Sequence, residues 1–131
     1  MINTLEEARL FFRDDRYAIE TGIELLEAEE NRALVALTIT SSHKNAGNRV
    51  MGAVYFTMAD FAFAVAANFG RPVTFTTTSQ ISFLAPARGE RLFAEAKIIR
   101  DGKKICFSEC RVTDDLGTEI ALVTASGARM A

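Results

Sequence analysis

The middle of the chain is its most apolar part. The segment from Met51 to Gly70 (MGAVYFTMADFAFAVAANFG) contains six alanines and closes on a glycine. Its length and alanine content predict a helix, and a glycine at its end is typical of a C-cap. Because apolar residues occupy all sides of this segment, we expect a helix that is buried all round and wrapped by other structure.

Segments that alternate between apolar and polar residues follow the apolar helix. This alternation predicts successive strands over residues 73–84, 91–100, 103–113 and 118–129. Pro86 stops the first of them. Asp101-Gly102 is a strong hairpin signal between the second and third, and Asp114 to Gly117 marks the next turn.

The first third of the chain predicts one helix and two more strands. Thr4 followed by Glu7 matches a capping box that starts a helix, and this helix ends at Asp14 to Arg16. Alternating and β-branched residues then predict strands over residues 17–27 and 32–40. The segment from residue 41 to residue 50 (SSHKNAGNRV) is polar and rich in turn formers, so we expect a loop there.

The order of these elements predicts an α+β fold. A single antiparallel sheet that curls around the long central apolar helix, with a short helix at the N-terminus, satisfies the whole pattern. The chain has 131 residues and a mass of 14.4 kDa. We therefore expect one domain over residues 1–131.

Composition excludes several classes of protein. Fifteen Lys and Arg against seventeen Asp and Glu give a net charge of −2, without the basic excess of a nucleic-acid or anionic-membrane binder. The first residues lack the order of a signal peptide, and the apolar run carries an acid at its centre. We expect a cytoplasmic protein that binds neither nucleic acid nor membranes.

The two cysteines, Cys106 and Cys110, fall on a predicted strand. On one face of a strand they would stand ~13 Å apart, at ~3.3 Å per residue, which is too far for a disulfide. With the single histidine, His43, they form no zinc-binding spacing. We expect two small core residues and no metal site.

Asp60 is the most informative residue because it lies in the middle of the apolar helix. An unpaired carboxylate among apolar neighbours costs several kcal/mol, so it pairs, takes a proton or lines a wet cleft. It is about 12 Å from Gly52 at ~1.5 Å per residue, beyond the stabilising reach of the helix start. Desolvation predicts a raised pKa and a useful general base. The alternative is a structural carboxylate that accepts hydrogen bonds from Thr or Tyr hydroxyls, within the chain or across a subunit boundary.

Three further features are candidates for chemistry. Gly52 and Ala53 begin the predicted helix, whose free N–H groups favour a developing oxyanion, although any helix start gives this signal. The loop residue His43 lacks a nucleophile as partner, so we expect it to be solvated. A run of hydroxyl side chains is either plain strand surface or a source of groups that position water or substrate, and it comprises Thr74, Thr76, Thr77, Thr78 and Ser79.

The segment from Asn45 to Asp60 resembles a known pattern. Hotdog-fold acyl-CoA thioesterases of the phenylacetate-degradation (PaaI-like) type have an Asn, a His-Gly-Gly six residues later, and an acid nine residues after that His. In this chain Asn45, Met51-Gly52-Ala53 and Asp60 stand at these spacings. The stretch FLAPARGERLFAEAKIIRDGKK also resembles the family's region after the helix. The resemblance covers nearly the whole chain and implies a hotdog fold.

The resemblance also implies roles for individual residues. Asp60 would be the general base for the hydrolytic water or the nucleophile itself, and the Gly52 N–H would polarise the thioester carbonyl. Asn45 would hold the carbonyl or the water, and Thr77 or Thr76 would orient the water. Substrate contacts are implied for the remaining candidates, which are Met51, Ala53 and the basic residues Arg88 and Lys103 near the CoA phosphates.

The family's site lies between subunits, with the acid of one chain facing the loop of its partner. The resemblance therefore implies a homodimer or homotetramer. It implies an acyl-CoA substrate and no cofactor, because CoA is part of the substrate.

Two positions depart from the family pattern and leave alternatives open. Met51 stands in place of the His, and Ala53 in place of the second Gly. The first hypothesis is an enzyme that hydrolyses acyl-CoA thioesters. The second is a non-catalytic acyl-CoA-binding or regulatory module. The third is a dehydratase or hydratase of hydroxyacyl thioesters, which needs a His paired with the acid and has only His43 as a candidate.

Overall fold

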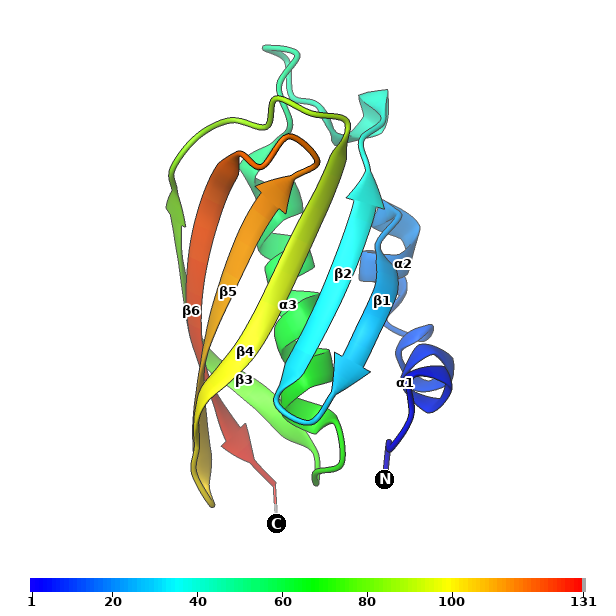
Figure 1. Ribbon diagram of the computed structural model, residues 1–131, viewed down its shortest axis with the longest axis vertical. Coiled ribbons are helices and arrows are strands. Elements are labelled where there is room, and N and C mark those ends of the chain that lie inside the picture. The colour runs from blue at the N-terminus through cyan, green and yellow to red at the C-terminus, as the bar shows by residue number, and fades with distance from the viewer. Residues whose placement is uncertain (131) are drawn as a thin grey trace.

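One antiparallel sheet of six strands curls around a long helix (Figure 1). The structure is a computed structural model that describes residues 1–130. Its strand order is β1-β2-β4-β5-β6-β3. The strands are β1 (Glu24–Glu29), β2 (Arg32–Thr38), β3 (Thr74–Phe83), β4 (Arg91–Asp101), β5 (Ile105–Asp114) and β6 (Glu119–Arg129). The helices are α1 (Leu5–Phe12), α2 (Arg16–Thr21), the 3-10 turn η1 (Ser41–His43) and α3 (Gly52–Asn68).

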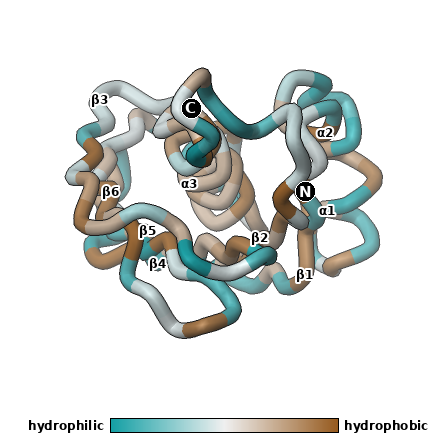
Figure 2. The backbone as a smooth tube through the Cα atoms, turned by 90° about the horizontal axis from the view of Figure 1, so that it is seen from above, coloured by the Kyte–Doolittle hydropathy of each residue, from teal (hydrophilic) through white to brown (hydrophobic). Residues whose placement is uncertain are grey.

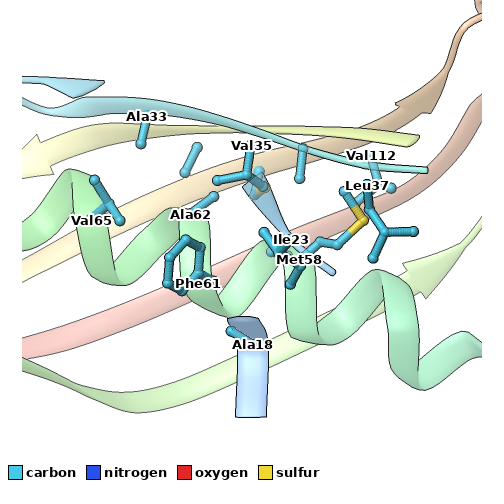
Figure 3. Close-up of a cluster of buried hydrophobic side chains, with 14 of the residues drawn as sticks. Ala18, Ile23, Ala33, Val35, Leu37, Met58, Phe61, Ala62, Val65 and Val112 are labelled. Atoms are coloured by element: carbon cyan, nitrogen blue, oxygen red, sulfur yellow. The ribbon is translucent and has the colours of Figure 1, made fainter. Parts of the chain in front are cut away.

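The core forms where α3 meets the concave face of the sheet. Seen from above, α3 lies in the hollow of the sheet, with α1 and α2 beyond the β1 side (Figure 2). Met58 and Val65 of α3 are fully buried: Met58 lies beside Leu37 of β2 and Val112 of β5, and Val65, further along the helix, faces Ala33 of β2 (Figure 3). Strand β4 presents alternate small residues to the same face, so that α3 packs close to the sheet.

The elements from α3 onward match the sequence prediction closely. The predicted four strands correspond to β3 to β6, and the hairpin at Asp101-Gly102 joins β4 to β5. Cys106 and Cys110 are free and buried on the core face of β5, as expected. The N-cap half of the predicted capping box is confirmed, because the Thr4 hydroxyl accepts the Glu7 N–H (3.1 Å), while the Glu7 carboxylate accepts the Asn3 N–H (3.2 Å) in place of the Thr4 N–H.

The predicted strand over residues 17–27 is wrong in its first half. Residues 16–21 form α2, and β1 begins only at Glu24. Gly22 ends this helix with φ 104°, and its N–H donates to the carbonyls of Ala18 and Ile19. A left-handed glycine is a helix-ending signal that outweighs the alternation of the apolar residues around it.

The expectation that the apolar helix is buried all round is wrong as well. Ten residues of α3 are buried, but Ala53 and Asp60 are exposed. Thr57, which lies between these two, and Ala64, which follows Asp60 by one turn, are only partly covered. These positions recur at helical spacing and form one open stripe, because the sheet covers only one side of α3. The helix also ends earlier than predicted, with Phe69 as C-cap and Gly70 following it at φ 66°.

Candidate active site

The first turn of α3 presents unused hydrogen-bond donors. The N-cap residue Met51 supplies no side-chain hydrogen bond, and within residues 1–130 the N–H groups of Gly52 and Ala53 have no partner. The Met51 N–H donates to the carbonyl of His43 (2.9 Å), which holds the loop against this turn. Free N–H groups at a helix start stabilise negative charge on an approaching oxygen.

Asp60 lies further along the open stripe of α3. Burial among apolar neighbours raises the pKa of its carboxyl group, although the side chain still reaches solvent. Within residues 1–130 no hydrogen bond or ion pair holds this carboxylate. The structural alternative, a carboxylate held by hydroxyls of its own chain, is therefore not realised. A desolvated carboxylate that reaches solvent is suited to accept a proton from water.

A second carboxylate faces Asp60 from the residue before α2. Asp15 and Asp60 line a common hollow of about 210 Å³ together with Tyr17, Thr57 and Phe61. Burial raises the pKa of Asp15, and the charges of Asp60 and Asp14 raise it further. Asp15 is not a candidate for chemistry from the sequence, because the residues after it fit a strand and give no sign that it faces Asp60.

Asn45 uses one end of its amide to build the loop before α3. Its Oδ1 accepts the N–H groups of Gly47 (2.9 Å) and Arg49 (3.2 Å), and its backbone N–H donates to the Arg49 carbonyl (2.8 Å). The turn closes through Asn48, which has φ 60°. Only the Nδ2 group of Asn45 is left to hold a carbonyl or a water.

His43 is not the solvated loop residue that we expected. It is 7% exposed, its Nδ1 accepts the Thr40 N–H (2.9 Å), and its Nε2 lies 2.6 Å from the Thr21 carbonyl. This places the proton on Nε2 and leaves neither nitrogen free for acid–base chemistry. The side chain ties η1 to the end of α2. A dehydratase or hydratase mechanism therefore loses its one candidate histidine.

The hydroxyl candidates lie on β3, at the open edge of the sheet. The Thr77 hydroxyl contacts the carbonyl (3.1 Å) and the hydroxyl (2.8 Å) of Ser126, and Thr78 contacts the same hydroxyl (2.6 Å). Thr76 is exposed at the irregularity in pairing between Thr76 and Thr78. No hydrogen bond within residues 1–130 joins either Thr76 or Thr77 to Asp60.

A basic hollow lies beside the start of α3. Lys44 and Arg49 of the loop and Arg88 of the segment before β4 line a space of about 730 Å³ together with one acid, Glu90, and among residues 1–130 none of the three cations forms an ion pair. No spacing in the sequence groups Lys44 and Arg49 with Arg88, because they lie in two separate loops. Lys103 does not join them, since its turn lies at the opposite end of the sheet (Figure 1).

Asp114 fixes the segment that carries Arg88. Its carboxylate accepts the N–H groups of Arg88 (2.8 Å), Gly89 (2.9 Å), Leu116 (3.0 Å) and Thr118 (2.9 Å). Burial by itself raises the pKa of Asp114, but these hydrogen bonds outweigh it and hold the pKa well below its usual range. From the sequence this residue is only part of a turn.

Comparison with known proteins places these features in a family. The Thioesterase superfamily model matches residues 47–121. A protein from Archaeoglobus fulgidus whose name suggests an esterase is 30% identical over 112 residues, which cover 85% of this chain and 73% of that protein. The acyl-coenzyme A thioesterase PaaI from Escherichia coli is 26% identical over 126 residues, which cover 95% of this chain and 90% of that protein.

The fold agrees with the sequence comparison. The structure of PaaI, from the phenylacetic acid degradation operon of Escherichia coli, matches this chain with a TM-score of 0.89 and 26% identity, over 95% of this chain and 91% of that one. The curled sheet around one long helix is the hotdog fold of thioesterases. The chain belongs to the Thioesterase superfamily. The predicted hotdog fold and PaaI-like class are confirmed.

Within residues 1–130 no helix is long and apolar enough to cross a membrane. In the same part of the chain, no three residues among His, Cys, Asp and Glu are grouped so that they could hold a metal ion.

Proposed function

We propose that this protein hydrolyses acyl-CoA thioesters and that Asp60 carries the reaction. The observation behind this is the unpaired carboxylate of Asp60 on the open stripe of α3, in a chain of the Thioesterase superfamily. The named activity of the relative PaaI supports acyl-CoA as the substrate class.

The proposed site needs two copies of the chain. Gly52 and Asp60 are about 12 Å apart along α3 at ~1.5 Å per residue, too far for both to reach one thioester carbonyl. Strand β3 ends the sheet and leaves one edge unpaired within the chain. Pairing two β3 edges antiparallel about a two-fold axis would bring Gly52 of one chain toward Asp60 of its partner. This edge supports a homodimer, and sedimentation should then give twice the chain mass of 14.4 kDa.

In the proposed reaction, the N–H of Gly52 donates to the thioester carbonyl. Asp60 takes a proton from a water molecule as the water oxygen bonds to the carbonyl carbon, and the negative charge that forms on the carbonyl oxygen is held at the helix start. The C–S bond then breaks, the carbonyl re-forms, and the CoA sulfur leaves with the proton that Asp60 took from the water. In the alternative route, the Asp60 carboxylate attacks the carbonyl carbon and the C–S bond breaks, so that CoA leaves as a thiolate and a mixed anhydride remains. Water then hydrolyses the anhydride to the free acid and the regenerated Asp60 carboxylate, and the proton released in this step ends on the CoA sulfur. Asn45 Nδ2, and Thr77 or Thr76 from the β3 edge, are the proposed groups that orient the water.

The basic hollow is the proposed place for the CoA phosphates. Lys44, Arg49 and Arg88 lack ion-pair partners within residues 1–130 and lie beside the helix start that would hold the thioester. Cations in such a position bind phosphate groups by charge-assisted hydrogen bonds. Lys103 is left out of this proposal because it lies at the far end of the sheet. A cytoplasmic location and the absence of a cofactor stay predictions.

The test is hydrolysis of acyl-CoA substrates of several chain lengths, followed through the free CoA thiol, by the wild type and by Asp60→Asn. We expect turnover that falls at least 100-fold in the variant, the scale of losing a general base. Glu6→Gln, an exposed acid on α1, is the matched control and should keep full activity. Tight binding of acyl-CoA without turnover in the wild type would instead favour the non-catalytic binding module.

A further inference from the structure

A groove runs along the open stripe of α3, with α2 as its other wall. One hollow of about 290 Å³ lies at the helix start. Met51, Ala53 and Thr57 line it on the α3 side, Tyr17 and Glu20 line it on the α2 side, and the loop before α3 adds Lys44 at its rim. The second hollow, of about 210 Å³, lies at Asp60 and is also lined by Tyr17 and Thr57. Because both hollows share this pair of residues, Tyr17 and Thr57 divide one groove into two parts.

Tyr17 has no evident role in holding the fold together. Its side chain is 74% exposed, and within residues 1–130 its hydroxyl forms no hydrogen bond and its ring pairs with no other aromatic ring. The buried anchor of α2 is Ala18, one residue further on. A large, solvent-facing aromatic side chain between two hollows is therefore available to contact a ligand.

The first hollow leads away from the free N–H groups of Gly52 and Ala53. A thioester whose carbonyl oxygen accepts a hydrogen bond there has its acyl group beside the apolar atoms of Met51, Ala53 and the Thr57 methyl. Tyr17 stands at the end of this space and separates it from the hollow at Asp60. An acyl chain that grows along α3 from the helix start thus meets the Tyr17 ring.

We propose that Tyr17 is a specificity-determining residue that limits the length of the acyl group along α3. This inference rests on the proposed acyl-CoA site and adds the element that sets its depth. Shorter acyl groups fill the first hollow, and the Tyr17 ring blocks longer ones from the second. Removing the ring joins the two hollows into one longer groove.

The experiment measures binding, so that it does not depend on turnover. S-alkyl-CoA thioethers, which cannot be hydrolysed, are titrated in a series of increasing chain length against the wild type, Tyr17→Ala and Tyr17→Phe. In the wild type we expect affinity to rise by about fourfold per methylene and then to level off. In Tyr17→Ala the rise should continue to longer chains, while Tyr17→Phe, which keeps the ring, should behave as the wild type.

Leu10→Ala removes an exposed apolar side chain from α1, away from the groove, and is the matched control. The same chain-length profile in Tyr17→Ala and the wild type would overturn the proposal, as would the absence of any binding that depends on chain length. If Asp60→Asn hydrolysed acyl-CoA as fast as the wild type, this would count against the proposed hydrolysis by Asp60 alone. The thioether binding series would still test the role of Tyr17, because it does not require the Asp60 carboxylate to react.

Discussion

The ring of Phe83 lies against Gly52, so close that a Cβ added to Gly52 would stand 2.8 Å from the ring carbon Cε1. Phe83 is the last residue of β3 and 59% exposed, and its ring also lies 6.5 Å from that of Tyr55 in the first turn of α3. The glycine thus leaves room for an aromatic ring at the place where the thioester carbonyl would approach. The end of the edge strand and the start of the central helix are coupled through this contact.

Gly52→Ala should therefore lower activity more than stability. The exposed Phe83 ring can move to make room, and alanine is a better helix former than glycine, so we expect the free energy of unfolding to change by less than about 1 kcal/mol. The methyl group and the displaced ring narrow the approach to the N–H groups, and kcat/KM should fall by about 100-fold, the scale of one lost oxyanion donor. Urea unfolding and thioester hydrolysis measure the two effects.

Ala64→Gly is the matched control for that variant, because Ala64 is a partly covered residue of the same helix that lies outside the proposed carbonyl site. It should keep the activity of the wild type. Full activity in Gly52→Ala would mean that the carbonyl does not approach this backbone position.

The pH dependence of hydrolysis should report the environment of Asp60. A general base works only when ionised, and burial raises the pKa of Asp60 above its usual value of 3.8. The acidic limb of kcat/KM against pH should therefore lie above the range of an ordinary carboxylate. An acidic limb near pH 4 would contradict a desolvated base.

The same raised pKa has a consequence for stability. The folded state disfavours the ionised form of Asp60, so ionisation lowers the free energy of unfolding. This loss of stability is absent below the unfolded pKa and is fully present once the pH exceeds the folded pKa. Asp60→Asn removes this penalty. At pH 7 the variant should unfold at a slightly higher temperature than the wild type, although it has lost activity, and the difference should vanish near pH 3. Thermal unfolding followed by circular dichroism measures it.

The sequence predicts the parts of this fold that depend on local periodicity and turn chemistry. Alternation and the Asp101-Gly102 turn located β3 to β6, and the Asn45, Gly52 and Asp60 spacing located the candidate site. Residues 17–21 were misassigned to a strand because apolar residues spaced by two fit both a strand and a very short helix. Only Gly22, held at φ 104°, separates the two possibilities.

What the sequence could not predict depends on which segments meet in space. The open stripe of α3 exists because the sheet covers only one side of the helix. The residue pattern of α3, which is apolar on all sides, does not indicate which side stays open. Likewise Lys44 and Arg88 belong to loops separated by the whole of α3 and β3, and Asp15 faces Asp60 only because α2 packs beside α3. Such pairings arise from tertiary contacts and leave no spacing in the sequence.

Asp114→Asn should destabilise the protein. Each carboxylate oxygen accepts two backbone N–H groups, and an amide would turn an NH₂ group toward one of these pairs. Leaving buried donors unpaired costs about 1–3 kcal/mol each, so we expect a loss of about 3 kcal/mol at pH 7, measured by urea unfolding. Asp14→Asn, at an exposed position, should have little effect.

The stabilisation by Asp114 should also depend on pH. Because its pKa is lowered in the folded state, the contribution is present above the unfolded pKa of about 3.9 and is lost as the pH falls toward the folded value. The wild type and Asp114→Asn should therefore approach each other in stability below about pH 4. If the difference in free energy of unfolding between the wild type and Asp114→Asn stayed constant down to pH 2, the four N–H groups would not depend on the negative charge of Asp114.

The basic hollow should control affinity for the CoA portion of the substrate and leave the chemical step unchanged. Replacing Arg88, Lys44 or Arg49 by Ala removes a cation that lacks an ion-pair partner within residues 1–130. We expect KM to rise by about 3- to 10-fold in each variant with kcat nearly unchanged, the scale of one partly exposed charge-assisted hydrogen bond. The rise should shrink at high salt, where exposed charges are screened.

Arg13→Ala separates this local effect from one of net charge. It removes the same charge from an exposed position at the end of α1, away from the basic hollow and from the β3 edge, and should leave KM unchanged. Substrates that lack the nucleotide of CoA, such as acyl-pantetheine thioesters, should not distinguish the Arg88→Ala variant from the wild type. An equal rise in KM for Arg13→Ala and Arg88→Ala would instead indicate long-range attraction by the whole protein, because only a defined phosphate site makes the position of the cation matter.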